Sequence, residues 1–240
     1  MHDCYYPRLL FITTSAFNKV TGGGITFSNL FYGWPKDCLF TIHNDPVPVS
    51  YEICANYYKL GLKEIDKKGI LRWIYQAISP HNKGAEVFSE NNPSMVTKIL
   101  RNIKDLIYGN SVPENVQISH DLSRWIAEFR PEVIYTILGS NSMMELVIKV
   151  SNQFNVPVII HMMDDWPEVI CRGGMVSFIE RTKMNNQLNQ IIHKAAERLS
   201  ICEAMSSEYQ KRYGVSFSSF QNTIDTRKWD AYVKQDLFVQ

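Results

Sequence analysis

The residues best suited to chemistry follow a short apolar run in the second half of the chain. The segment from Val156 to Ile160 reads as a strand buried on both faces of a parallel sheet. The polar and aromatic side chains that come next are His161, Asp164, Asp165 and Trp166. Pro167 then prevents simple continuation of the ladder. In open α/β sheets ligands bind outside the carboxyl ends of the strands, so this segment is a candidate site.

Two interpretations of this segment remain open. Asp164 or His161 could act as a general base at the edge of the sheet. Alternatively, one aspartate caps the next helix and His161 forms a hydrogen bond in the core. The two adjacent carboxylates could bind Mg²⁺, but a pair of carboxylates is weak support for a metal, and we expect none.

A run of three glycines is the second candidate. Arg8 to Thr14 reads as the first strand, and Gly22, Gly23 and Gly24 follow it in a loop before a helix that starts near Ile25. Backbone N–H groups in such a loop, next to a helix N-terminus, can bind phosphate. The run lies too far from the strand for a G-x-G-x-x-G turn and lacks the G-K-[ST] of a P-loop. The alternative is a flexible turn that needs positive φ.

A third polar loop lies between two predicted strands. Val133 to Leu138 reads as a strand, and a helix from about Ser142 to Phe154 leads to the strand at Val156. The short connections predict a right-handed parallel crossover, which brings Ser140 and Asn141 beside the Asp164 loop. Helix capping is the first expectation for these two residues, and contact with a ligand is the second.

The remaining elements must position these loops. Strand and helix patterns alternate along the chain, which predicts an α/β protein with a single open, mainly parallel sheet and helices on both faces. The other predicted strands are Cys38–Ile42, residues near Tyr57–Leu60, Arg198–Cys202 and Val215–Gln221. The other predicted helices are Lys67–Ser79, Ser94–Tyr108, Ser119–Phe129, Phe178–Glu197 and Ser206–Tyr213, with a polar loop from His81 to Asn92.

Composition restricts the class of protein. The chain has 240 residues, 45% of them hydrophobic, and a net charge of +1, so a basic nucleic-acid-binding surface is not expected. No apolar run approaches the ~20 residues of a membrane span, and the N-terminus lacks a signal-peptide core, so we expect a cytoplasmic protein. The five scattered cysteines contain no C-x-x-C pair. The aromatic and basic helical segments, such as Ser94–Tyr108, could cover an acceptor or touch a membrane surface, although such stripes commonly face the core.

The last sixty residues resemble the second half of the N-terminal domain in family-4 (group 1) glycosyltransferases of the GT-B fold. In that family a strand ends in Ser-Glu, a helix ends in Tyr-Gly, and a final strand ends in Asn-Gly-(Val/Ile)-Asp. The corresponding residues here are Cys202-Glu203, Tyr213-Gly214 and Asn222-Thr223-Ile224-Asp225. Pro157 to Pro167 also resembles the family strand P-V-V-x-x-x-H-D-x-W-P, and the glycine run resembles its Gly-rich loop. The family's frequent catalytic histidine aligns with Met163, not with His161.

The resemblance implies a Rossmann-like N-terminal domain over residues 1–225 and the start of a linker over 226–240. The linker would lead to a missing C-terminal domain that binds most of the nucleotide-sugar, so this chain alone is expected to be inactive. The implied reaction moves a sugar from a nucleotide-sugar, the substrate, to a sugar or lipid-linked acceptor, as in polysaccharide biosynthesis, with no further cofactor.

The resemblance also assigns roles to particular residues. Asp164 and His161 are implied as catalytic, and Gly22, Gly23 and Gly24 as the loop that binds the donor phosphates. The implied acceptor-binding residues are Ser140, Asn141, Asp165 and Trp166, with Glu203 and Asn222 as further site positions. Two alternatives are one half of a GT-B-type sugar-nucleotide epimerase and a non-catalytic subunit that binds an acceptor or partner.

Overall fold

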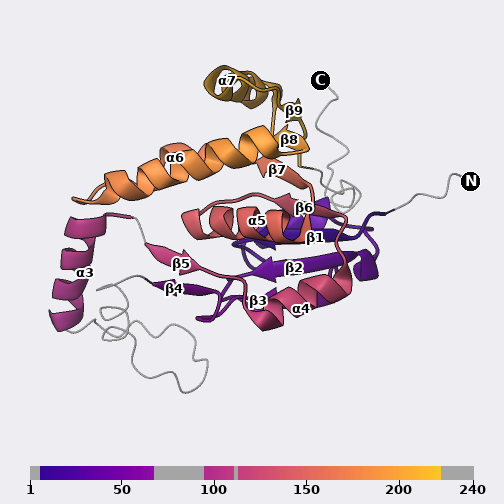
Figure 1. The fold of residues 1–240 in the computed structure, drawn as a ribbon, viewed down its shortest axis with the longest axis horizontal. Coiled ribbons are helices and arrows are strands. Elements are labelled where there is room, and N and C mark those ends of the chain that lie inside the picture. Colours follow the sequence, from indigo (N-terminus) through magenta and orange to yellow (C-terminus); the bar gives the residue numbers. More distant parts are fainter. Residues whose placement is uncertain (1–5, 68–94, 111–112, 223–240) are drawn as a thin grey trace, which may run out of the picture.

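The centre of the molecule is a seven-stranded sheet in which every pairing is parallel (Figure 1). The computed structural model describes residues 6–67, 95–110 and 113–222. The strands are β1 (Leu9–Thr13), β2 (Leu39–His43), β3 (Asn56–Lys59), β6 (Val133–Thr136), β7 (Val158–Met162), β8 (Glu197–Ser200) and β9 (Ser218–Ser219). Their spatial order is β3-β2-β1-β6-β7-β8-β9, so the predicted open parallel sheet is confirmed.

The strand order reverses at the middle of the sheet. From β1 the chain builds β2 and β3 on one side, then returns to add β6, β7, β8 and β9 on the other. This is the arrangement of doubly wound, Rossmann-like sheets, in which ligands bind at the carboxyl ends of the strands where the order reverses. In this chain that position is the pair of loops that follow β1 and β6.

Helices cover both faces of the sheet, as predicted. The helices are α1 (Gly22–Leu30), α3 (Met95–Tyr108), α4 (His120–Phe129), α5 (Asn141–Phe154), α6 (Ser177–Lys194) and α7 (Glu203–Tyr213), with 3₁₀ turns η1 (Lys36–Cys38) and η2 (Trp166–Glu168). Leu10 and Ile12 of β1 pack in one core with α4, α5 and α6. Phe11, on the opposite face, packs against Phe27 and Phe31 at α1. The alternation of side chains along β1 therefore separates two cores.

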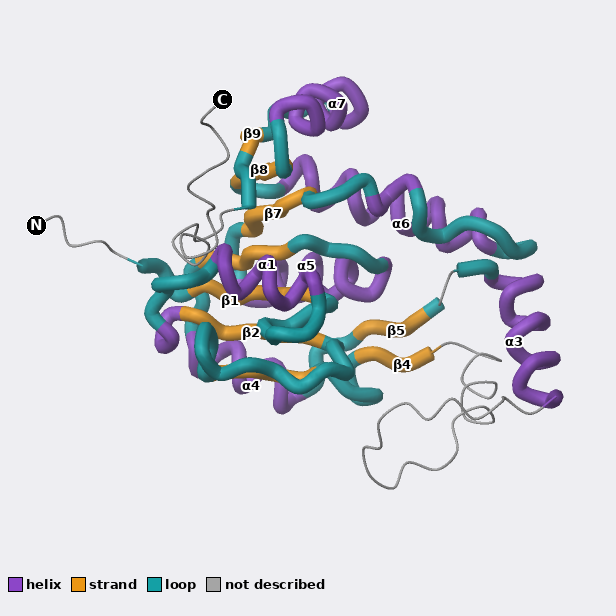
Figure 2. The backbone as a smooth tube through the Cα atoms, turned by 180° about the vertical axis from the view of Figure 1, so that it is seen from behind, coloured by secondary structure: helices purple, strands orange, loops and turns teal. Residues whose placement is uncertain are grey.

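A short ribbon outside the main sheet was not predicted. β4 (Ile65–Lys67) and β5 (Glu114–Val116) pair antiparallel, and Figure 2 shows them near α3 at one end of the molecule. The predicted helix Lys67–Ser79 falls outside the described residues except for Lys67, which ends β4. The predicted loop from His81 to Asn92 lies wholly outside them.

The prediction that the glycine run forms a loop is wrong. Helix α1 begins at Gly22, and Thr21 caps it by accepting a hydrogen bond from Gly24 N to Oγ1 at 3.1 Å. None of the three glycines has positive φ. A Cβ on Gly24 would overlap the Asn18 side chain, whereas the space beside Gly22 is open. Glycine is therefore required at position 24 because Asn18 packs closely against it, and not because the backbone needs positive φ.

Several element boundaries also differ from the prediction. β7 begins at Val158 and extends to Met162, so His161 lies inside the strand and not after its end. α7 begins at Glu203, and β9 is limited to Ser218 and Ser219. These shifts at element ends leave the predicted order of strands and helices intact.

Candidate functional site

The candidate site lies at the carboxyl edge of the sheet, where the loops after β1, β6 and β7 meet. A Cβ on Gly139, in the loop after β6, would lie 3.7 Å from Thr14 Oγ1 in the loop after β1. A Cβ on Gly23 would lie 3.4 Å from Ser15 Cβ, so the start of α1 borders these loops. β7 pairs directly with β6, which sets the Asp164 loop next to this point.

Asp164 is the free carboxylate of the site. Its side chain is exposed and has no hydrogen bond or ion pair with any described residue, whereas its backbone carbonyl accepts a hydrogen bond from the Tyr209 hydroxyl at 3.2 Å. A charged group without a partner at the edge of a parallel sheet is available to a ligand. The structure therefore leaves the Asp164 carboxylate accessible, and its role stays a prediction.

Asp165, its neighbour, is already engaged. Its Oδ1 accepts hydrogen bonds from the Tyr209 hydroxyl at 3.1 Å and from Arg212 Nη1 at 2.9 Å, and its Oδ2 accepts from Arg212 Nη2 at 3.3 Å. The hydrogen bond to Asp165 raises the pKa of Arg212, and burial, followed by the charge of Asp165, raises the pKa of Tyr209. Asp165 makes no side-chain cap to η2. The pair with Arg212 favours a structural role over the predicted contact with an acceptor.

His161 is enclosed in the sheet and is 0% exposed. The Tyr135 hydroxyl lies 2.5 Å from its Nδ1, and its Nε2 lies 3.1 Å from the carbonyl oxygen of Phe220. Because a carbonyl only accepts, Nε2 carries the proton and Nδ1 accepts from Tyr135. Burial lowers the pKa of His161 to about 4. These contacts favour the core hydrogen-bonding interpretation over a general base.

A buried polar network that the sequence did not predict holds the chain between β1 and α1. Asp45, after β2, accepts hydrogen bonds from Ala16 N at 3.1 Å and Val47 N at 2.9 Å. Asn18 Oδ1 accepts from Thr21 N at 2.7 Å and from Thr21 Oγ1 at 3.0 Å. The polar residues after β2 were visible in the sequence, but their contact with Ala16 and Asn18 depends on the paired strands.

The two predicted residues in the loop after β6 bind neighbouring protein groups. Ser140 caps α5 by accepting a hydrogen bond from Met143 N at 3.2 Å, as expected. Asn141 donates through Nδ2 to Glu180 Oε2 at 3.0 Å, while its Oδ1 is buried with no hydrogen-bond partner among the described residues. The capping expectation is confirmed for Ser140 and wrong for Asn141, which is the first residue of α5 and bonds to Glu180. Contact with an acceptor stays a prediction for both.

The other predicted site residues lie farther along the carboxyl edge. Trp166 packs partly against the core, and its Nε1 is buried without a hydrogen-bond partner in the described ranges. Glu203 is exposed at the start of α7, and Asn222 has a buried Oδ1 that finds no partner among the residues described. Their roles at the site stay predictions.

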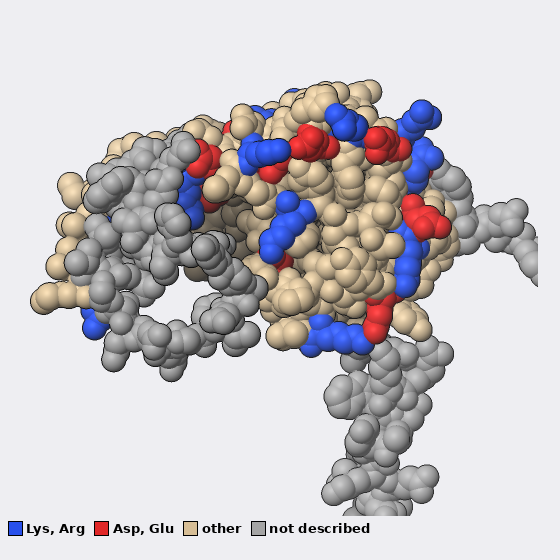
Figure 3. Space-filling model, turned by 90° about the horizontal axis from the view of Figure 1, so that it is seen from below, with Lys and Arg blue, Asp and Glu red and all other residues tan. Residues whose placement is uncertain are grey.

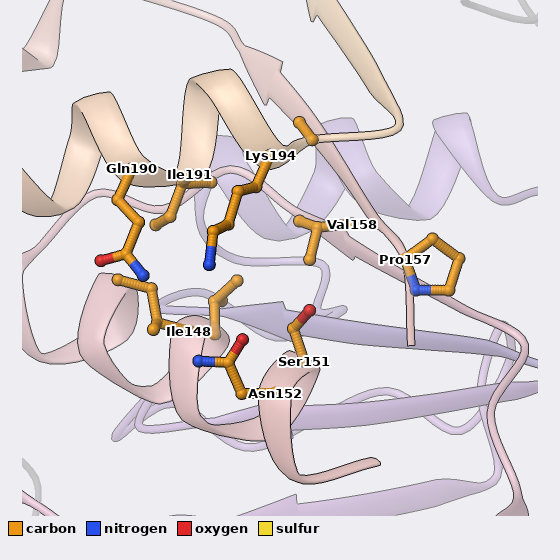
Figure 4. Close-up of a pocket in the computed structure, with 10 residues that line it drawn as sticks. Ile148, Ser151, Asn152, Pro157, Val158, Gln190, Ile191 and Lys194 are labelled. Carbon is orange, nitrogen blue, oxygen red and sulfur yellow. The ribbon is translucent and has the colours of Figure 1, made fainter. Parts of the chain in front are cut away.

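A separate hollow of about 60 Å³ lies away from this edge (Figure 4). It is lined by α5, the start of β7 and the end of α6, through Ile148, Ser151, Asn152, Pro157, Val158, Gln190, Ile191 and Lys194. Because β7 enters the sheet there, the hollow belongs to the opposite, amino edge of the strands. Its size suits a few water molecules, so it is not part of the candidate site.

Charge and metal-ligating groups are dispersed. On the face in Figure 3, the basic and acidic side chains of the described residues are interspersed. Within the described ranges no three His, Cys, Asp or Glu side chains gather as a set that could hold a metal ion. None of the helices in those ranges combines the length and apolar character needed to cross a bilayer.

The sequence matches no protein-family model, and a search of curated proteins finds no significant relative. The structure itself defines the class as an α/β, Rossmann-like fold. The residues at the carboxyl edge of the sheet are therefore the basis for any functional assignment.

Proposed function

We propose that this chain is the acceptor-side half of a glycosyltransferase that moves a sugar from a nucleotide-sugar to an acceptor hydroxyl. The observation that carries the proposal is Asp164, an exposed carboxylate without a partner among the described residues, in the loop after β7, one strand away from the point where the strand order reverses. Its position also fits the aspartate of the H-D-x-W-P pattern in the resemblance described above. The motifs at Tyr213-Gly214 and Asn222 support the same family.

Asp164 is assigned the role of general base. Transfer requires removal of the proton from the acceptor hydroxyl as the bond to the sugar forms, and a free carboxylate at the carboxyl edge of the sheet can accept it. His161 is the weaker candidate, because both its ring nitrogens are engaged inside the sheet. Asp165 orients the loop through Arg212 and is expected to act as a support.

The start of α1 is assigned to the donor diphosphate. The first N–H groups of a helix have no partner within it, and the helix dipole favours an anion there. Gly24 N already donates to Thr21 Oγ1. The N–H groups of Gly22 and Gly23 are the ones that remain for a ligand at the helix end. The open space beside Gly22 would let a phosphate approach the backbone. We infer that a second, Rossmann-like domain supplies the remaining donor contacts.

The test compares two neighbouring aspartates in the complete enzyme. Asp164→Asn should reduce turnover by about 10² to 10⁴, the usual contribution of a general base, with an unchanged melting temperature. Asp165→Asn is the matched control, because it should lower the melting temperature by weakening the Arg212 pair and retain most of the turnover. Full activity of Asp164→Asn at unchanged stability would rule out the assignment.

Donor binding tests the half-enzyme part of the proposal. Calorimetric titration of the 240-residue chain with common nucleotide-sugars should give weak binding, because most donor contacts are assigned to the other domain. Sub-micromolar affinity for any of them would contradict that division of the site.

A further inference from the structure

Helix α3 carries an apolar stripe that no described residue covers. Four side chains form it, each at least 41% exposed: Met95, Ile99, Ile103 and Leu106. Their spacing of four, four and three residues places them on one side of the helix. A contiguous exposed apolar surface of this kind marks a contact site in soluble proteins, so the stripe needs an occupant.

The position of α3 is fixed by a backbone clamp, which we define as its contacts with residues 172–176. Three backbone hydrogen bonds form the clamp: Met175 N to Leu106 O and Val176 N to Ile107 O, both at 2.9 Å, and Asn110 N to Arg172 O at 3.1 Å. Glycines permit this close crossing, because a Cβ on Gly109 or Gly174 would overlap the backbone opposite. The stripe is therefore held in a defined orientation relative to the start of α6.

The ribbon of β4 and β5 determines where the chain before α3 begins. Lys67, the last residue of β4, pairs with Glu114, the first residue of β5, and Figure 2 shows both strands near α3. Asn110, at the clamped end of α3, lies only four positions before Glu114. The chain that leaves β4 therefore starts near the C-terminal end of α3. It must reach Met95 at the N-terminal end, so it runs in the opposite direction to the helix.

The sequence of this connection contains a matching apolar face. The connection, residues 68–94, lies outside the described residues, and helical spacing relates Ile70, Leu71, Ile74 and Ile78 within it. A helix over residues 70–78 would be about 13 Å long, and the 14 residues of α3 span about 21 Å, so the two match in length. Successive elements of a chain are usually neighbours in space.

The tether favours this segment over a second copy of the chain. Residues 70–78 are joined to β4 on one side and to α3 on the other, so their effective concentration at the stripe is on the order of millimolar. A second copy at micromolar concentration does not compete with that.

We propose that residues 70–78 form a helix that packs antiparallel on the α3 stripe and makes a helical hairpin with it, next to the β4–β5 ribbon. In this register Ile70 faces Leu106, Ile74 faces Ile103 and Ile78 faces Ile99. The pairing does not depend on the proposed reaction.

Engineered disulfides test the register in the 240-residue chain. Ile78→Cys with Ile99→Cys should cross-link in most molecules under mild oxidation, and so should Ile74→Cys with Ile103→Cys, because facing side chains meet the distance that a disulfide needs. Ile78→Cys with Leu106→Cys is the matched control. It uses the same two faces with an offset of seven residues, about 10 Å along the helix, and should not cross-link. Tryptic peptide masses identify each bridge. Equal yields for facing and offset pairs would overturn the proposal, as would no cross-link in any pair.

Hydrogen exchange tests the contact without new covalent bonds. Amides of residues 70–78 should exchange at least tenfold more slowly than in an unfolded peptide of the same sequence, and Ile99→Asp should remove this protection. Val20→Asp is the matched control, since Val20 is 77% exposed and precedes α1, and it should leave the protection unchanged. Amides of β1 and β7 should exchange alike in all three proteins, which shows that the sheet stays folded.

Three outcomes of the second experiment would overturn the hairpin. The first is no protection of residues 70–78 in the parent chain, and the second is protection that Ile99→Asp leaves intact. The third is a dimer in sedimentation velocity that Ile99→Asp dissociates, because the stripe would then be covered by a second copy.

Discussion

The two polar regions at the carboxyl edge differ in how their side chains are bonded. Around the loop after β1, Asn18 and Asp45 are buried and bonded to neighbouring backbone N–H groups. In the loop after β7, Asp164 is exposed and has no side-chain partner among the described residues. Buried polar groups in native proteins are nearly always bonded, so the first region supports the fold. The unbonded carboxylate of the second is the one free to meet a ligand.

The largest expected effect on stability comes from the buried region. Asp45→Ala removes the acceptor for Ala16 N and Val47 N and leaves both N–H groups without it, which should cost about 2–4 kcal/mol of unfolding free energy. Chemical denaturation measures this loss. Asp37→Ala, an exposed aspartate in η1, is the control and should stay within about 0.5 kcal/mol. Equal effects of the two changes would contradict the division between the regions.

His161, three residues before Asp164, is a buried side chain whose two ring nitrogens are both hydrogen-bonded. Its pKa is lowered by burial from an ordinary 6.5 to about 4 in the folded protein. The unfolded chain therefore binds the proton first, so the contribution of His161 is complete above about pH 6.5 and is lost as the pH falls toward 4. The loss should reach roughly 2–3 kcal/mol. His161→Gln should flatten this part of the stability profile, and an unchanged profile would refute the assignment.

The smallest expected changes in stability come from alanine substitutions at two glycines in the first turn of α1. Gly24→Ala should destabilise the fold by about 1–3 kcal/mol, because the new methyl group overlaps Asn18. Gly22→Ala meets open space and should be neutral or slightly stabilising, since alanine favours a helix by up to ~1 kcal/mol. In the complete enzyme the same Gly22 change should weaken donor binding by crowding the phosphate. Thermal melts and donor titrations together distinguish the two roles.

Much of the fold could be predicted because the central strands are buried on both faces. β1, β6 and β7 are short apolar runs, and the helices between them carry apolar residues at helical spacing. The ribbon of β4 and β5 has no such signal, because each strand is three residues long and its partner lies about fifty residues away. Three glycines fit a loop as well as a helix turn, and only the contact with Asn18 decides between them.

The place of the polar loop after β7 could be predicted from the sequence, but the contacts of its side chains could not. The sequence places two aspartates, Asp164 and Asp165, after a buried strand, and nothing local distinguishes them. The difference arises from Arg212, which lies 47 residues away in the chain and bonds to Asp165 only when α7 is packed on the sheet. The burial of His161 likewise depends on Tyr135 and on Phe220, 26 and 59 residues distant.

The clamp between α3 and residues 172–176 makes the loop after β7 a segment fixed at both ends. β7 holds it at Met162, and three backbone hydrogen bonds hold it from Arg172 onward. Between these points Tyr209 donates to the Asp164 carbonyl and Arg212 pairs with Asp165, so α7 holds the middle of the segment as well. A displacement of α3 must therefore either break the three backbone hydrogen bonds or shift residues 172–176 as well. Helix α3 and the Asp164 loop are thus joined through backbone hydrogen bonds, although their sequence positions are more than fifty residues apart.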